Sequence, residues 1–119
     1  MLWIAGEPQR VPEVVVKLIL DESVTACFSA ASIWEIAIKS GQGRPDFDLD
    51  PAELWRRFVD RGYREISVTG VHAAAVRSLP PIHKDPFDRM LIAQAGLEKL
   101  ILYTCDVTVA QYPGPIVRV

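Results

Sequence analysis

Apolar residues recur along the chain with two periods, one typical of helices and one typical of short buried strands. Offsets of three and four residues, together with turn and cap residues, predict helices over 12–20, 29–39, 51–60, 70–78 and 85–98. Runs rich in β-branched and aromatic residues predict strands over 24–28, 63–68, 100–103 and 116–119, with a helical turn over 106–112. Strands that alternate with helices favour right-handed crossovers, and so predict an α/β fold with a mainly parallel sheet covered on both faces.

Three of these helices carry further expectations. The helix over 29–39 is apolar almost all round, so we expect it to be buried on more than one side. The helix over 51–60 is amphipathic, with Leu54, Trp55, Phe58 and Val59 expected to face inward and Arg56, Arg57 and Arg61 outward. The helix over 85–98 has the strongest pattern, because Phe87, Met90, Leu91 and Ala95 lie at offsets 0, 3, 4 and 8.

Length and composition limit the kind of protein this is. The 119 residues are 50% apolar, which predicts a single domain over 1–119 with one core. There is no apolar run of the roughly 18 residues that a membrane helix needs, and no basic segment precedes the apolar start, so we expect neither membrane insertion nor export. A cytoplasmic location follows as the expectation. The net charge of −2 argues against a protein that coats nucleic acid by bulk charge.

The cysteines and histidines narrow the possible chemistry. Cys27 and Cys105 adjoin apolar runs, where buried reduced thiols are expected rather than a disulfide. His72 and His83 are isolated in the sequence and belong to no zinc-binding spacing, so zinc is disfavoured.

Three carboxylates occupy equivalent positions. Glu35, Asp88 and Asp106 each lie near a junction at which a strand or loop leads into a helix, the part of an α/β sheet where sites form. If they converge, their mutual repulsion requires a cation, and oxygen ligands suit Mg²⁺ or Mn²⁺. Such a centre supports phosphodiester hydrolysis, and a helix N-terminus nearby is expected to attract the phosphate.

Each carboxylate also has a local structural explanation. Ser32 and Glu35 form a capping box by sequence, and Glu35 can pair with Lys39 one turn later. Asp85 is a good N-cap before Pro86, which leaves Asp88 in the first helical turn, where the helix dipole favours any acid. Asp106 can cap the last helical turn, with Thr104 sharing that role.

The residues around the carboxylates favour the functional interpretation. Residues 29–39, 82–95 and 104–106 read SAASIWEIAIK, IHKDPFDRMLIAQA and TCD. In this order and spacing they resemble the three signatures of the PIN-domain toxins of the VapC type, and the similarity runs across almost the whole chain.

The resemblance implies a PIN-like α/β/α sandwich and a metal-dependent endoribonuclease that acts in a toxin–antitoxin pair. It assigns catalytic and metal-binding roles to Glu35, Asp88 and Asp106, with Mg²⁺ or Mn²⁺ as cofactor, and supporting roles to Thr104 and Asp85. RNA substrate, a cognate antitoxin and a second copy of the chain are the implied partners. An antitoxin arginine that replaces the cation in the acid cluster would explain inhibition.

Basic residues near the acids are candidate RNA contacts. Arg89 and Lys84 lie in the second signature, and Arg56, Arg57, Arg61 and Arg64 form a further group, although such residues more often serve only as solvated surface.

One part of the family pattern is missing. The PIN-type toxins begin with a strand that ends in an Asp, whereas this chain starts at Met1-Leu2-Trp3, so the first strand and its acid are expected to be absent. Either an internal Met has been taken as the start, or the chain is an inactive remnant. The space of that central strand must then be filled, bridged or collapsed, and a complete sheet of ordinary order would contradict this expectation.

Two other functions therefore remain open. The chain can be a catalytically inactive PIN-like module that binds antitoxin or a homologous subunit. It can also be a DNA nuclease with similar active-site chemistry, which a comparison of RNA and DNA substrates separates.

Overall fold

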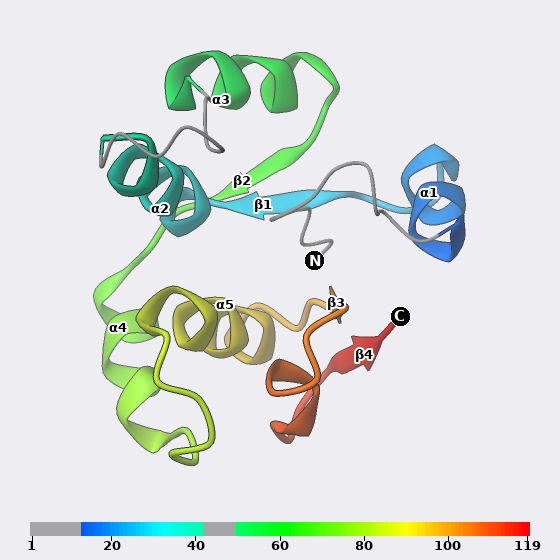
Figure 1. The fold of residues 1–119 in the computed structure, drawn as a ribbon. Coiled ribbons are helices and arrows are strands. Elements are labelled where there is room, and N and C mark those ends of the chain that lie inside the picture. Colours follow the sequence, from blue (N-terminus) through cyan, green and yellow to red (C-terminus); the bar gives the residue numbers. More distant parts are fainter. Residues whose placement is uncertain (1–12, 42–49) are drawn as a thin grey trace.

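The computed structural model describes residues 13–41 and 50–119 and consists of helices that alternate with short strands (Figure 1). The elements are α1 (Glu13–Leu20), β1 (Cys27–Ser29), α2 (Ala30–Gly41), α3 (Pro51–Asp60), β2 (Arg64–Ile66), α4 (Gly70–Ala75), η2 (Val76–Ser78), α5 (Pro86–Leu97), β3 (Leu102–Thr104), η3 (Val109–Gln111) and β4 (Ile116–Arg118). Every predicted element is present, with strands shorter than expected. The α/β fold class is confirmed.

The radius of gyration is 14.0 Å, close to the roughly 13–14 Å of a compactly folded chain of this length. No helix in the described segments has the length and apolar character needed to cross a membrane.

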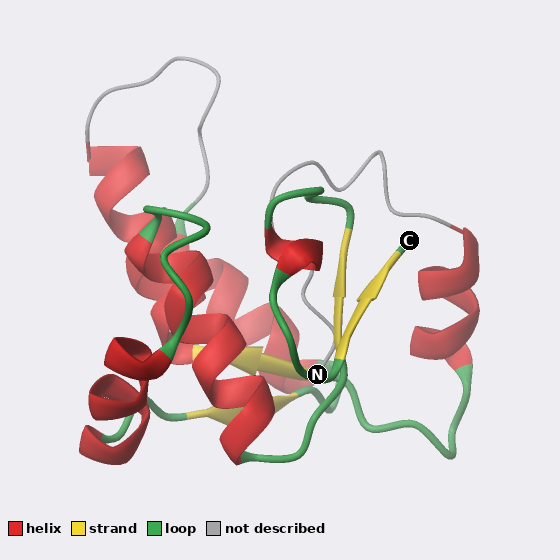
Figure 2. Cartoon of the chain, turned by 90° about the horizontal axis from the view of Figure 1, so that it is seen from below, coloured by secondary structure: helices red, strands yellow, loops and turns green. Residues whose placement is uncertain are grey.

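The four strands form two parallel pairs. Residue Cys27 of β1 lies opposite Arg64 of β2, and Leu102 of β3 lies opposite Ile116 of β4. Figure 2 shows the two pairs as separate, differently oriented ribbons, so the strands of residues 13–41 and 50–119 do not join into one sheet. The predicted parallel pairing is confirmed. The expected loss of a first strand concerns the chain start, where residues 1–12 lie outside the described residues, and it stays a prediction.

Helix α5 joins the two strand pairs through the core. Its Leu91, Ile92 and Ala95 side chains are at most 3% exposed, and they cluster with residues of both strand pairs and of the C-terminal turn. The other members of the cluster are Cys27, Ile66, Leu102, Val109 and Tyr112. The helix also packs against α2 and α4. Burial on several sides fixes the N-terminal turn of α5 relative to the loop after β3.

The helix starts follow from short polar side chains that accept backbone N–H groups. Asp50 accepts from Ala52 N at 3.0 Å before Pro51, and Asp85 does the same for α5. At α2 the cap is Ser29, whose Oγ accepts from Ala31 N at 3.0 Å. The predicted Ser32–Glu35 capping box is therefore wrong, because α2 begins at Ala30 and Ser32 lies inside it.

Two predictions about buried faces need correction. Helix α2 buries Ala31, Ser32 and Glu35, while Trp34 is 63% exposed, so the helix is covered on one side only. Helix α3 has no fully buried residue, and its Trp55 and Val59 are about 40% exposed. For α2, an apolar composition without a strong amphipathic pattern did not distinguish a core helix from one that covers the core at the edge.

The cysteine prediction is half correct. Both thiols are free, but only Cys27 is buried, whereas Cys105 is exposed. Cys105 follows β3 directly, in the loop that leads to Asp106.

Candidate metal centre

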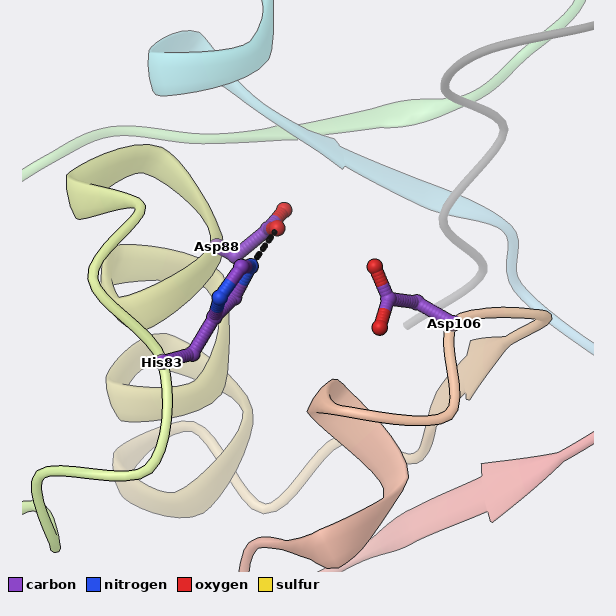
Figure 3. Close-up of side chains that lie close together, drawn as sticks. All are labelled: His83, Asp88 and Asp106. Carbon is purple, nitrogen blue, oxygen red and sulfur yellow. Dashed lines mark hydrogen bonds and ion pairs between the residues drawn. The ribbon is translucent and has the colours of Figure 1, made fainter.

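Asp88 lies in the first turn of α5 and pairs with His83 from the loop before that helix. The Nε2 atom of His83 is 2.8 Å from Oδ2 of Asp88 (Figure 3). The two side chains are 24% and 13% exposed, so water screens this contact only partly. The second oxygen of Asp88, Oδ1, has no hydrogen-bond partner among the described residues.

Asp106 lies in the loop after β3 and approaches the His83–Asp88 pair from that side. Strand β3 itself is largely buried. Thr104, 2% exposed at the end of β3, accepts the Asp106 N–H through its Oγ1 at 3.0 Å. One carboxylate oxygen of Asp106, Oδ1, accepts from Thr108 N at 2.7 Å and Val109 N at 3.2 Å. The predicted capping role is therefore present, and so is the supporting hydroxyl of Thr104. The capping leaves Oδ2 of Asp106 available.

His83, Asp88 and Asp106 form one cluster. Each contributes a potential metal-ligand atom, and these atoms lie within 4.8 Å of one another. Figure 3 shows the Asp106 carboxylate directed toward the His83–Asp88 pair. A small pocket lined by Asp88, Leu91, Leu102, Thr104 and Val109 adjoins the cluster on the core side. Asp88 and Asp106 were predicted to converge because one follows a loop and the other follows a strand. The structure brings these two carboxylates together.

The surroundings of Asp88 disfavour its charged form. Burial raises the pKa of the Asp88 carboxyl above its usual range, and the hydrogen bond with His83 opposes this shift. Repulsion by Asp85 and Glu35 raises the same pKa further. The charged form of Asp88 is therefore disfavoured first by burial and then by the carboxylates nearby, a cost that a bound cation would offset.

Glu35 is close enough to repel Asp88 but lies outside the cluster. Its Oε2 accepts from Lys39 Nζ at 2.7 Å, in the i,i+4 pair expected from the sequence, and its side chain is 10% exposed. The structure brings together two of the three predicted acids and leaves the third in an ion pair on α2.

Asp85 occupies the N-cap of α5 and takes up the free donors there. Its Oδ1 accepts from Phe87 N at 2.9 Å and Asp88 N at 3.3 Å, and its carbonyl accepts from Arg89 N. Since Pro86 has no N–H, the first turn of α5 presents no unused backbone donor. The expectation that a helix N-terminus attracts the phosphate stays a prediction, and at α5 Asp85 has the structural role of a cap.

Arg89 serves the fold of the loop before α5. Its guanidinium donates to the carbonyl oxygens of Pro80 at 2.9 Å and Val76 at 3.0 Å, and to Tyr112 Oη at 3.1 Å. Lys84, by contrast, is exposed. The predicted RNA contact by either residue stays a prediction, but only the Lys84 ammonium lies free at the surface. Arg56, Arg57, Arg61 and Arg64 are exposed too, and Arg57 pairs with Glu53 at 2.6 Å.

His83 is the cluster member that sequence reasoning missed. It was set aside because no second histidine lies at a zinc-binding spacing. A signal was nevertheless present, since His83 lies five residues before Asp88 within one signature, and the Asp85-Pro86 helix start between them folds the loop back onto the first turn. The contact between His83 and Asp88 depends on how this loop folds back onto α5. The spacing of apolar residues predicts helices and strands but does not predict such a loop conformation.

The donor set fits a divalent cation. Two carboxylates, each with one unengaged oxygen, and one imidazole are ligands that Mn²⁺ and related divalent ions accept, and Mg²⁺ accepts the oxygens. The residues present would thus hold such an ion through Asp88 and Asp106.

Comparison with known proteins gives one match. The family model of the PIN domain matches residues 1–115 of the 119. No curated protein and no solved structure matches the chain. PIN domains typically depend on a divalent metal, and such a match indicates nuclease activity in general. The matched region spans strands β1 to β3, helix α5 and the whole His83–Asp88–Asp106 cluster, and the chain therefore belongs to the PIN-domain family.

Proposed function

We propose that this protein is a divalent-metal-dependent endoribonuclease, the toxin of a toxin–antitoxin pair. The observation that supports it is the approach of Asp88 and Asp106 to within 4.8 Å in a chain of the PIN family. The preference for RNA and the toxin role rest on the resemblance of residues 29–39, 82–95 and 104–106 to the VapC-type toxins.

The chemistry follows from the arrangement of acids. A divalent cation at Asp88 and Asp106 would lower the pKa of a water molecule, orient it in line with the scissile bond and neutralise charge on the phosphoryl oxygens. The chain supplies the geometry: the Asp85 cap and the buried face of α5 fix Asp88, and Thr104 with the η3 turn fixes Asp106. Rigid elements on both sides hold the two carboxylates before any ligand arrives.

A cleavage assay on the 119-residue chain tests this proposal. Single-stranded RNA, single-stranded DNA and duplex DNA are incubated with metal-free protein, with Mg²⁺ and with Mn²⁺. We expect RNA cleavage only with a divalent ion and its loss on chelation. We also expect a decrease of at least about 100-fold in Asp88→Asn and in Asp106→Asn.

Asp60→Asn is the matched control, because Asp60 is an exposed carboxylate at the end of α3. It should cleave like wild type. Metal-dependent cleavage of DNA but not RNA would replace the ribonuclease by a DNA nuclease. Metal-independent cleavage, or equal activity in the Asp88→Asn variant, would contradict the proposed centre.

A second candidate is a catalytically inactive module that binds antitoxin or a homologous subunit. The 2.7 Å ion pair between Glu35 and Lys39 favours it, because it keeps a carboxylate out of the cluster. The same assay decides between the two: a folded chain that binds Mn²⁺ and RNA without cleaving supports the module.

The partners belong to the proposal as well. We propose that a cognate antitoxin inhibits the protein by placing an arginine between Asp88 and Asp106, where the cation would bind. We also propose that the protein forms a homodimer. Exposed apolar residues on α1 and α2, such as Leu20 at 75% and Trp34 at 63%, are available for such contacts. Undiminished antitoxin binding after Asp88→Asn and Asp106→Asn would contradict the arginine contact, and a monomer in light scattering would contradict the dimer.

A further inference from the structure

The main chain of His83 is fixed from both sides. Its N–H donates to Tyr112 Oη at 2.7 Å, and Arg89 Nη1 approaches its carbonyl oxygen at 3.4 Å. Tyr112 is 4% exposed and belongs to the core, so the loop is tied to the core beneath it. The backbone contacts therefore place His83 beside the first turn of α5, within reach of Asp88, and the ring itself is held there by its contact with Asp88 Oδ2.

The separation of the ring from Asp88 suits two ligands of one ion. Neighbouring ligands of a divalent ion bound at about 2.1 Å lie about 3 Å apart. The observed distance from His83 Nε2 to Asp88 Oδ2 is 2.8 Å. A hydrogen bond and a shared cation thus require almost the same placement of these atoms.

The carboxylates leave the third position to nitrogen. Asp106 uses Oδ1 for the η3 turn and keeps Oδ2 for an ion, whereas Asp88 can offer the Oδ2 that faces His83, because a shared ion would replace the hydrogen bond between the two side chains. Glu35, the other acid nearby, is neutralised by Lys39. Of the described residues within reach, the His83 imidazole is the one that completes a set of three.

We propose that His83 is a metal ligand of this centre and gives it a preference for Mn²⁺ over Mg²⁺. This inference rests on the metal requirement of the proposed function. For Nε2 to bind, its lone pair must face the ion, so the single proton of the neutral ring lies on Nδ1. Imidazole nitrogen suits transition-metal ions, whereas Mg²⁺ prefers oxygen ligands and retains its waters.

Electron spin-echo spectroscopy of bound Mn²⁺ tests this without any activity measurement. We expect nitrogen modulation from the metal-loaded wild-type chain, and a change to the ¹⁵N pattern after labelling with [¹⁵N]histidine. His72 does not complicate the result, because its two ring nitrogens contact Thr69 N and Glu98 Oε1. The labelling needs no mutation, so the test stands even where a variant folds poorly.

Titrations of Mn²⁺ and Mg²⁺ into wild type, His83→Gln and Asp88→Asn complete the test. In His83→Gln we expect loss of the modulation and an increase of at least about tenfold in the Kd for Mn²⁺, with a much smaller change for Mg²⁺. Mn²⁺ binding that is lost in Asp88→Asn but shows no nitrogen coupling and no effect of His83→Gln would overturn the inference while leaving the proposed centre intact. Failure of wild type to bind either ion would overturn both.

Discussion

His83 and Asp88 are joined at 2.8 Å across five residues of sequence, by a loop that folds back on the helix it precedes. The contact holds the Asp88 carboxylate in the direction of Asp106 and partly compensates the cost of burying it. The geometry of the cluster is thus set by the fold itself, and a ligand finds it prepared.

The raised pKa of Asp88 predicts that the site costs stability. The folded state binds the Asp88 proton more tightly than the unfolded state, so the group adds stability below its unfolded pKa and that contribution is lost as the pH rises through the folded value. In metal-free protein at about pH 7, Asp88→Asn should therefore raise the free energy of unfolding. The gain should shrink as the pH falls through the raised pKa of Asp88, as followed by urea denaturation with chelator present.

Asp60→Asn again serves as the comparison, because Asp60 is exposed and should show little change at any pH. Added Mn²⁺ should reverse the order and make wild type the more stable protein. A metal-free Asp88→Asn variant that is less stable than wild type at neutral pH would show that the burial cost is smaller than the gain from the hydrogen bond and helix dipole.

Arg89 is predicted to stabilise the fold through three separate acceptors. Replacing it by Met keeps much of the volume but removes the charged donor from the carbonyls of Pro80 and Val76 and from the Tyr112 hydroxyl, each of which keeps one backbone N–H donor. We expect a loss of about 2–4 kcal/mol in the free energy of unfolding. Arg77→Met, at an exposed position in η2, should stay within about 0.5 kcal/mol of wild type. Equal effects of the two changes would refute the loop-organising role.

The Glu35–Lys39 pair allows a test with an internal control. Lys39→Met leaves a carboxylate with a 10% exposed side chain unpaired, and should cost about 1–2 kcal/mol in metal-free protein. Lys17→Met breaks a pair of the same spacing whose side chains are 77% and 86% exposed, so it should cost less than about 0.5 kcal/mol. If Glu35 can join the centre, Mn²⁺ will recover part of the Lys39→Met loss. Absence of any recovery would place Glu35 outside the working site.

Lys84 is the exposed cation nearest to the cluster along the chain, and we expect it to contact phosphate. Lys84→Ala should weaken RNA binding uniformly across sequences and reduce the slope of log K against log salt by about 1. Lys17→Ala, on α1, should change neither affinity nor slope. Binding by filter retention at several salt concentrations measures both. An unchanged slope for Lys84→Ala would mean that the lysine is only solvated.

The order and type of the elements were predictable because local signals agree with the fold. Asp85-Pro86 and Asp50-Pro51 start α5 and α3 at the expected residues, since a cap and a proline specify a helix start with few neighbours. The exposure of Trp34 was not predictable, because it depends on which elements pack against α2 and not on the composition of α2. Strand ends differ for the same reason: Val24 and Thr25 have strand-like sequence but no paired neighbour in β2, and Ala26 contributes only its carbonyl, which accepts from Arg64 N at 2.9 Å.

The site divides in the same way. Asp88 and Asp106 were found from their positions at element junctions, which the topology brings together. Glu35 also lies near such a junction, but it forms an ion pair with Lys39 one turn away. The sequence indicated both the ion pair and a metal-binding role for Glu35, and it could not decide between them. His83 joins the cluster because contacts with Arg89 and Tyr112 hold its loop against α5. These contacts link residues up to 29 positions apart, which local sequence patterns do not reveal.

The most direct test of the metal centre is a crystal structure of the chain grown with Mn²⁺, with anomalous data collected at the manganese edge. We expect one strong anomalous peak within bonding distance of carboxylate oxygens from both Asp88 and Asp106. A fully ordered cluster with no peak there, or with the ion bound elsewhere, would contradict it.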